Sequence, residues 1–324
     1  MSTKYKLLAL LTLLVPLSGI LALVIGSSDT GIDELWSYMS GQANSFTTTI
    51  ITLRTQRAID GFIVGGLLSM AGALLQVLLR NPLAEPYILG ISGGAGACTL
   101  IALLLGLSST WTPVTAFAGA LVSTLLVFSI SFSNGNWTTE RLLLTGVVIA
   151  AGWSAIISFL LAISKQQQIH GMLFWLMGDL SQASHTVTGF FVLIITFTIS
   201  WAIARPLNLL VRGQQQAAAL GENILQLRMI IFILAAAMTA TAVSMAGSIG
   251  FVGLIIPHAL RLIGFRDYRL LLPATILTGG SFLVLADTLA RSLLAPQQVP
   301  VGVLTALLGV PLFLLLLQNQ YKSR

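Results

Sequence analysis

The chain has 324 residues, of which 56% are hydrophobic and only 8% are charged. Soluble domains carry roughly 25% charged residues, so this chain has too few to cover the surface of a soluble globule. Its net charge of +6 at pH 7 would suit nucleic-acid binding, but basic residues at the ends of apolar stretches indicate membrane topology instead. The composition therefore predicts an all-α integral membrane protein and no nucleic-acid partner.

The spacing of the charges predicts where the membrane helices lie, because about 20 apolar residues cross a hydrocarbon core roughly 30 Å thick. A break at Gly247–Gly250 divides the longest ambiguous stretch, which one very long helix could otherwise fill. The length of the first stretch, with no clear cleavage site, favours a retained helix over a signal peptide. A single domain, 1–324, is expected with spans near 7–26, 58–79, 88–107, 113–133, 142–163, 187–204, 229–246, 249–264, 270–287 and 299–317.

The distribution of positive charge favours ten spans over nine. With ten spans and a cytoplasmic amino terminus, twelve Lys and Arg residues lie on the cytoplasmic side and four lie outside, whereas nine spans divide them equally. Cytoplasmic loops are enriched in Lys and Arg. We therefore expect a multi-pass protein of the cytoplasmic (inner) membrane with both termini in the cytoplasm.

A short repeat suggests internal symmetry. The tetrapeptide Ser69–Gly72 recurs as Ser244–Gly247, and Pro82 and Pro257 follow at the same offset of 175 residues. Five predicted spans separate the copies, and an odd number reverses the orientation. Inverted repeats are common in transporters, where the pathway lies near the repeat interface. Chance recurrence of small residues in a glycine-rich membrane protein is the alternative.

The chemistry of an enzyme or a primary pump is missing. No metal-binding motif is present, and none of the four lysines follows a glycine, which excludes a Walker A loop. The glycine-rich stretch at 90–96 therefore favours close helix packing over phosphate binding. We expect no catalytic residue, no metal site and no cofactor bound by this chain. An ion-coupled secondary transporter is the alternative from another class, but it requires carboxylates at membrane depth, where only Asp60 and Asp287 come near.

Two loop regions are candidates for contacts with partner proteins. The predicted cytoplasmic loop 205–228 contains a helix-prone segment that could press into a partner, although an ordinary connection is equally compatible. Arg54, Arg57 and Arg291 lie on the predicted outer side, where the topology rule disfavours them. Arginines suit bidentate pairing with carboxylates of a docking protein, and lipid headgroup contact is the alternative.

Several long motifs resemble those of the FecCD-type permeases, which are the transmembrane subunits of type II ABC importers for iron-siderophores, haem and cobalamin. They are Asn81–Pro86, Leu89–Gly94, Gly247–His258, Leu271–Pro273, Ala286–Arg291 and Val299–Pro311. The resemblance covers about residues 54–317. It implies the ABC type II importer permease fold, a homodimer with the translocation path on its axis, two cytoplasmic ABC ATPase subunits that bind ATP and Mg, and a periplasmic or lipid-anchored substrate-binding protein.

The resemblance also implies roles for particular residues and a mechanism of ATP-driven alternating access. The expected cargo is an iron(III)-siderophore, with cobalamin or haem as the alternative. The resemblance assigns ATPase coupling to Ala219, Leu220, Gly221 and Glu222. It assigns binding-protein docking to Arg54, Arg57 and Arg291. Thr138 and Thr139 match the cytoplasmic gate, and Trp175, Met177 and Gly178 match the translocation path.

Overall fold

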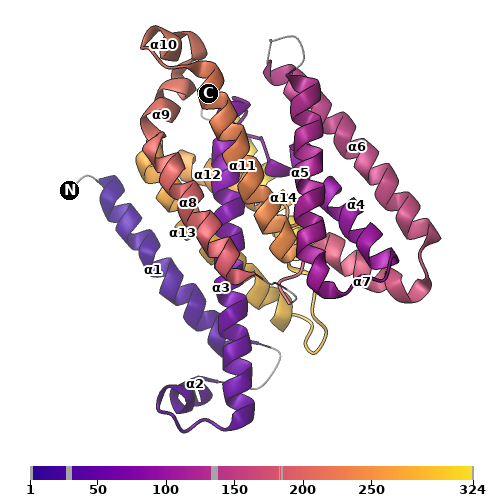
Figure 1. The fold of residues 1–324 in the computed structure, drawn as a ribbon. Helices are drawn as coiled ribbons and strands as arrows, with labels where there is room; N and C mark the ends of the chain where they lie inside the picture. The colour runs from indigo at the N-terminus through magenta and orange to yellow at the C-terminus, as the bar shows by residue number, and fades with distance from the viewer. Residues whose placement is uncertain (1–2, 27–30, 133–137, 182, 184, 323–324) are drawn as a thin grey trace.

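The computed structural model describes residues 3–26, 31–132, 138–181, 183 and 185–322. Within these ranges every regular element is a helix and no strand occurs. The helices form an elongated bundle whose two ends differ (Figure 1). One end, called the α10 end below, carries α9 and α10, and the opposite α2 end carries α2 and the amino-terminal part of α3.

The elements in chain order are α1 (Thr3–Val24), α2 (Ile32–Met39), α3 (Ser45–Leu78), the 3-10 helix η1 (Pro86–Leu89), α4 (Ile91–Leu104), η2 (Ser109–Trp111), α5 (Thr112–Ser131), α6 (Thr139–Ile163), α7 (Gln166–Met177), α8 (Thr186–Ala202), α9 (Ala204–Arg212), α10 (Gln214–Ala219), α11 (Ile224–Ala246), α12 (Val252–Leu262), α13 (Tyr268–Ser292) and α14 (Val301–Lys322).

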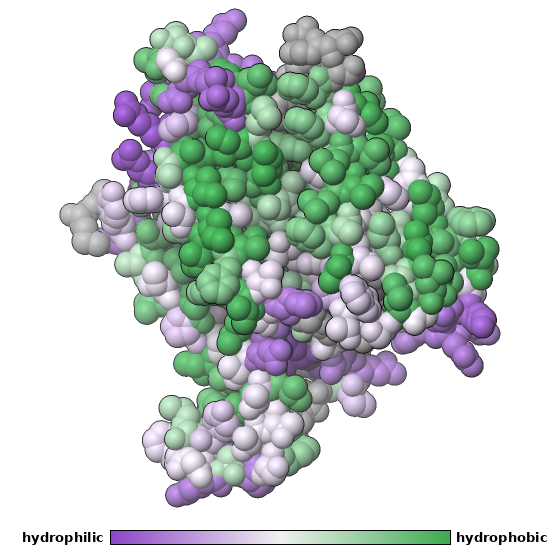
Figure 2. Space-filling model, viewed as in Figure 1, coloured by the Kyte–Doolittle hydropathy of each residue, from purple (hydrophilic) through white to green (hydrophobic). Residues whose placement is uncertain are grey.

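Helices lie in all ten regions where the sequence predicts spans. In the described part of the chain, six are long and apolar enough to cross a membrane, namely α1, α3, α5, α6, α11 and α13. Helices α8 and α9 meet the same test together, with a bend of 59° between them. The apolar helices α4, α12 and α14 are shorter, and that each of these crosses the whole bilayer stays a prediction. Hydrophobic side chains cover most of the middle of the bundle, and hydrophilic ones gather towards its ends (Figure 2).

Helix α3 forms the centre of the bundle, and its apolar stretch is almost completely buried. It packs against α11, α12 and α13, and glycines bring the backbones close together. A Cβ at Gly65 would overlap the backbone of Gly279 in α13, and a Cβ at Gly72 would overlap that of Gly253 in α12. Small residues at such crossings are typical of helix packing in membranes, where van der Waals contact between backbones stabilises association.

Helices α3 and α13 extend beyond the spans that the sequence predicts within them. Helix α3 begins at Ser45, upstream of the span predicted from residue 58. Asn44 caps the helix by accepting a hydrogen bond from the Thr47 N–H at 2.7 Å, and no proline or glycine interrupts the threonine-rich segment that follows. At 1.5 Å per residue, 34 residues span about 51 Å, which exceeds a hydrocarbon core of about 30 Å. Helix α13 likewise continues past residue 287 to Ser292. All three arginines predicted to lie beside spans therefore lie inside helices.

The repeat at an offset of 175 residues does not relate equivalent positions. Gly72 lies within α3, whereas Gly247 follows the end of α11. Pro82 lies in the connection after α3, and Pro257 lies inside α12. A different pair is alike in structure: Gly90 and Phe251, both in the left-handed conformation, immediately precede the short helices α4 and α12.

Candidate functional site

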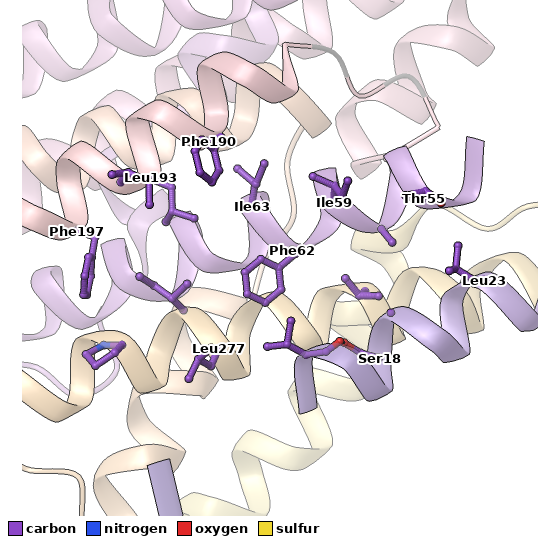
Figure 3. Close-up of a pocket in the computed structure, with 17 residues that line it drawn as sticks. Ser18, Leu23, Thr55, Ile59, Phe62, Ile63, Phe190, Leu193, Phe197 and Leu277 are labelled. Carbon is purple, nitrogen blue, oxygen red and sulfur yellow. The ribbon is translucent and has the colours of Figure 1, made fainter. Parts of the chain in front are cut away.

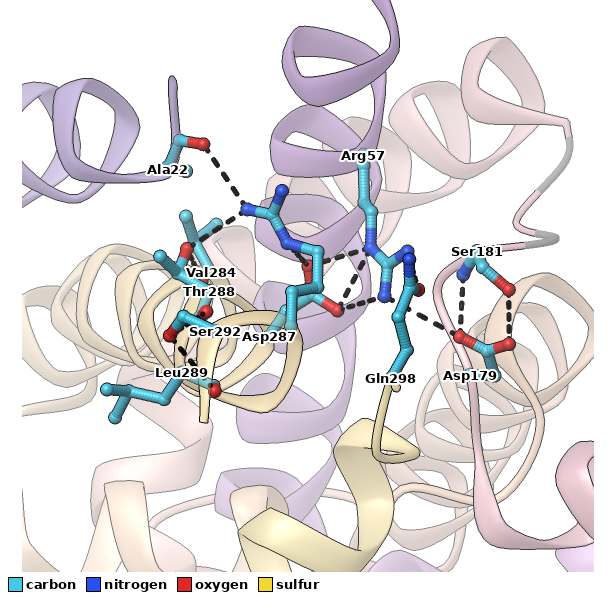
Figure 4. Close-up of polar contacts among 11 residues, drawn as sticks. Ala22, Arg57, Asp179, Ser181, Val284, Asp287, Thr288, Leu289, Ser292 and Gln298 are labelled. Carbon is cyan, nitrogen blue, oxygen red and sulfur yellow. Dashed lines mark hydrogen bonds and ion pairs between the residues drawn. The ribbon is translucent and has the colours of Figure 1, made fainter. Parts of the chain in front are cut away.

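An ion-pair network joins α3 to α13 on the α2 side of the bundle (Figure 4). The Arg57 guanidinium donates from Nε to Asp287 Oδ2 at 2.8 Å and from Nη2 to Asp287 Oδ1 at 2.7 Å. Its Nη1 donates to Gln298 Oε1 at 3.1 Å, and its Nη2 lies 3.6 Å from Asp179 Oδ1. Arg57 therefore connects two helices with the α7–α8 and α13–α14 connections.

The other two arginines neutralise the carboxyl end of α1. Arg54 Nη1 donates to the Leu23 carbonyl at 2.6 Å, and Arg291 Nη2 donates to the Ala22 carbonyl at 3.2 Å. The last carbonyls of a helix have no partner within the helix, and that end carries partial negative charge. Arg291 also pairs with Asp287 Oδ2 at 3.2 Å. Because Arg54 is 5% exposed and Arg291 6% exposed, both serve contacts inside the chain.

The three predicted docking arginines nonetheless lie together. They line one cavity of about 430 Å³, with Asp60 and Gln298 also in its wall. Asp60 accepts a hydrogen bond from the Thr186 hydroxyl at 2.6 Å. The buried acidic residues at this site are thus already paired with an arginine or a hydroxyl. Docking through these arginines stays a prediction. Arg57 is the best placed for it, because its side chain is more accessible than those of Asp287 and Arg291, with which it forms the ion-pair network.

Of the three predicted path residues, Trp175 lines a cavity. This cavity measures about 920 Å³, and Phe174, His170 and His185 also line it. Met177, by contrast, lies where its carbonyl oxygen closely approaches Gly302, the second residue of α14.

Gly178 belongs to a tightly packed backbone junction. Its φ of 76° lies in the left-handed region, and its carbonyl accepts a hydrogen bond from the Gly302 N–H at 3.3 Å. The next residue, Asp179, donates its N–H to the Ala246 carbonyl at 2.9 Å. A Cβ at Gly178 would also press against the carbonyl of Ser248. This junction therefore ties the end of α7 to the break after α11 and to the start of α14.

The predicted gate residues lie at the opposite end of α6 from α7, towards α10 (Figure 1). Thr138 caps α6, and its hydroxyl accepts a hydrogen bond from the Arg141 N–H at 3.3 Å. Thr139 is the first residue of α6 and is half-buried. Residues 133–137 lie outside the described part of the chain. The gate role itself stays a prediction.

The predicted coupling residues form the end of α10 and its closing turn. Ala219 ends the helix, and Gly221 adopts a φ of 87°. The Gly221 N–H donates to the Ala218 carbonyl, and the Glu222 N–H donates to the Ala217 carbonyl, which is the bonding pattern of a Schellman motif. This turn leaves Leu220 68% exposed, at the α10 end of the bundle. The geometry thus presents one large apolar side chain on a short, well-defined helix.

The FecCD transport family matches residues 12–319 of this chain. The chain belongs to that family. The cobalamin import system permease protein BtuC of Halobacterium salinarum is 40% identical over 83% of this chain and 73% of its own length. The hemin transport system permease protein HmuU of Yersinia pestis is 36% identical over 93% of both chains. A solved inward-facing conformation of a metal-chelate type ABC transporter shares 31% identity and a TM-score of 0.86, covering 97% of this chain and 99% of the other.

The chain is thus a multi-pass membrane permease of the FecCD family. In this permease, two family motifs far apart in sequence meet in space. Glu85 Oε1 accepts a hydrogen bond from the Phe251 N–H at 2.6 Å, and the Tyr87 hydroxyl accepts one from the Ile249 N–H at 2.9 Å. Glu85 thereby places a carboxylate at the amino terminus of α12, where the helix dipole stabilises negative charge. Burial in the connection between α3 and α4 raises the pKa of Glu85, and the hydrogen bond from Phe251 opposes that rise.

The sequence patterns assign no role to Glu85 or Asp179. Glu85 lies in a family motif, and an acidic residue beside a proline-containing turn is a signal for a helix cap. Asp179 follows the predicted path residue Gly178 directly. An acidic residue next to a predicted path, on the side that carries the predicted docking arginines, is a signal that could have identified it.

Proposed function

We propose that this FecCD permease is the membrane subunit of a binding-protein-dependent ABC importer, which moves a metal chelate across the inner membrane by ATP-driven alternating access. The observation that carries the proposal is that relatives matched over most of this chain are named as the permease of a cobalamin import system and the permease of a hemin transport system. Two differing ends of the bundle also fit a protein that meets one partner on each side of the membrane. ATP hydrolysis would take place on separate ATPase subunits.

The α10 end would contact the ATPase. The short helix and its closing turn hold Leu220 outward, where it could enter an apolar cleft. The cationic side chains Arg205 and Arg212 of α9 lie near it in the chain, as expected for the cytoplasmic side. We expect Leu220→Asp to lower ATPase stimulation and transport together. Gln215→Glu, an added negative charge on the exposed part of α10 outside the four predicted coupling residues, serves as the matched control.

The α2 end would contact the substrate-binding protein through Arg57. Its guanidinium pairs with Asp287, but it also reaches towards Asp179, whose side chain is more exposed. A carboxylate on the binding protein could replace Asp179 in this contact without breaking the Arg57–Asp287 pair. Charge-assisted pairing of this kind favours a bidentate arginine.

The permease would work as a homodimer. Helix α6 has an apolar stretch that is mostly not buried within one chain, with Leu144, Val147 and Val148 all exposed. Helix α14 exposes Leu307 and Leu308 in the same way. Lipid could cover these faces, so the test is cysteine cross-linking across α6 in membranes, in a Cys98→Ala background. A Leu144→Cys dimer that forms while an α1 Leu13→Cys dimer does not would support the homodimer.

For the cargo we propose a cobalamin-type corrinoid first, because the BtuC relative of Halobacterium salinarum shares 40% identity. Haem is the second candidate, because HmuU is 36% identical over nearly the whole chain. The iron(III)-siderophore expected from the sequence remains a third arm of the test, since neither of these relatives carries a siderophore in its name.

The deciding experiment is uptake into proteoliposomes that contain the permease and its ATPase, with the binding protein added. Labelled cobalamin, haemin and a ferric siderophore are compared with and without ATP. ATP-dependent uptake of one chelate supports the proposal and identifies the cargo. Uptake by the permease alone, driven by a proton or ion gradient, would instead indicate the secondary transporter that the sequence left as an alternative.

A further inference from the structure

An apolar groove of about 590 Å³ runs along the side of the bundle between α1 and α8, with α3 and α13 as its floor (Figure 3). Phe62 of α3, Phe190 of α8 and Leu277 of α13 line it from three sides. Gly19 of α1 lies along the fourth side, and a Cβ built there meets no atom within 4 Å. The groove is therefore open next to α1, and no side chain fills it there.

The lining offers nothing to a polar ligand. Among the described residues, Ser18 and Thr55 are the two lining residues with a polar side chain. Both hydroxyls are already bonded, Ser18 to the Val15 carbonyl at 3.0 Å and Thr55 to the Ile51 carbonyl at 2.7 Å. Water needs two or more polar partners to occupy a cavity, and an unpaired polar group in apolar surroundings is costly. The occupant must be apolar.

The position of the groove indicates the source of that occupant. At one end the groove reaches Leu23, whose carbonyl binds Arg54 near the end of α1, and from there it extends along α1 to Val15. It opens onto a surface of exposed apolar residues that includes Leu17 and Ile20 of α1 and Ile194 of α8. In a multi-pass membrane protein this surface is the contact with lipid, so the groove is continuous with the bilayer interface.

The surroundings of the groove select among apolar occupants. A helix has a diameter of about 10–12 Å, and a partner's helix would have to displace the lipid that covers the apolar surface around the groove. A single hydrocarbon chain is far narrower. Left empty, the groove would forfeit van der Waals contact along all four helices.

We propose that one acyl chain of a membrane phospholipid, from the leaflet on the α2 side, occupies this groove and fills the space between α1 and α8. The chain would support α1, which contacts α3 and α13 along one side and is otherwise largely exposed. Because Arg54 and Arg291 bind the end of the same helix, the lipid would also help to hold the ion-pair network in place.

Photolabelling tests the proposal. The purified permease is placed in nanodiscs of phosphatidylethanolamine and phosphatidylglycerol that contain a phospholipid with a diazirine on one acyl chain, and the labelled peptides are mapped by mass spectrometry. We expect label at Phe62, Phe190 and Leu277. Gly19→Trp should abolish it, because the indole enters the open space of the groove. The matched control Leu17→Trp, on the exposed face of α1 outside the lining, should keep it.

The outcomes are distinct. Equal labelling of the groove in the Gly19→Trp and Leu17→Trp variants would overturn the proposal, as would label spread evenly over all lipid-facing helices. Protection of the groove by a second copy or another subunit would assign it to a protein partner instead. Should Gly19→Trp fail to give a monodisperse protein, Gly19→Leu tests the same space with a smaller side chain. No transport is measured, so the result does not depend on the proposed function.

Discussion

Asp287 accepts three hydrogen bonds from Arg57, at 2.7, 2.8 and 3.1 Å, although 230 positions separate the two residues. The carboxylate is 3% exposed and also pairs with Arg291. One negative charge therefore holds two guanidinium groups where α3, α13 and the end of α1 meet. Arginine forms such bidentate pairs because its planar group matches the geometry of a carboxylate.

Replacing Asp287 with alanine should destabilise the permease strongly. The change leaves Arg57 and Arg291 without their shared counter-ion, and breaking a buried ion pair from one side costs about 3–5 kcal/mol. The expected result is a large drop in the thermal unfolding midpoint of the purified protein in detergent. The matched control is Asp33→Asn on α2, an exposed acidic residue, which should shift the midpoint little. Equal midpoints for the two variants would show that the network contributes nothing to stability.

Neutralising Asp179 should strengthen binding-protein docking. Asp179 lies 3.6 Å from Arg57 and is partly exposed, so Asp179→Asn should change stability by no more than about 1 kcal/mol. It removes a competitor for Arg57 and thereby favours a carboxylate of the partner. The measurement is the affinity of the binding protein for nanodisc-embedded permease at low and moderate salt, because screening weakens exposed charge pairs.

Ser181→Ala is the control for this effect, since Ser181 contacts Asp179 but not Arg57. It should leave the affinity unchanged, whereas Arg57→Ala should lower it. An affinity that falls in Asp179→Asn would contradict the competition and would indicate that Asp179 itself is part of the docking surface.

Removing the carboxylate of Glu85 should loosen the contact between two family motifs. Glu85→Ala deletes the acceptor for the Phe251 N–H at the start of α12, and losing a helix cap costs about 0.5–2 kcal/mol. Glu85→Gln keeps an oxygen acceptor and should lie between the wild type and alanine. Unfolding midpoints of the three proteins give the order, and hydrogen exchange at residues 249–255 should rise most in alanine. Exchange that is equal in all three would refute the cap.

The positions of the helices could largely be predicted from the sequence, because the length of an apolar run is set by the thickness of the bilayer. The start of α3 could not. Counting apolar residues places the start of this helix just after Arg57. The threonine-rich segment before Arg57, however, contains no residue that stops a helix, and Asn44 caps the helix well upstream. Polar residues can continue a membrane helix into water, and no rule based on hydropathy alone detects this.

The candidate site was predicted as a set of arginines but not as a network. The topology rule singled out Arg54, Arg57 and Arg291, and the structure brings them to one cavity. Their partners are carbonyls at the end of α1 and a carboxylate on α13. The contacts of Arg57 with Asp287 and of Arg291 with Ala22 join segments more than 200 residues apart, and a pattern of single residues carries no information about such pairings.

The crossing of α3 and α12 should tolerate no side chain at Gly72. A Cβ there would overlap the carbonyl group and Cα of Gly253, which are backbone atoms that cannot move aside alone. The two helices would have to separate, and overpacking of this kind costs about 1–3 kcal/mol, or more where the backbone must shift. We expect Gly72→Ala to lower both the yield of monodisperse protein and the unfolding midpoint by several degrees or more.

Gly19→Ala on α1 is the matched control, because the same added methyl group meets no atom within 4 Å there. Alanine is also the better helix former by about 1 kcal/mol, so this variant should be as stable as the wild type or slightly more so. Equal loss of stability in the two variants would show that glycine is needed for a reason other than space. A stable Gly72→Ala protein would mean that α3 and α12 cross at a greater distance than their glycines indicate.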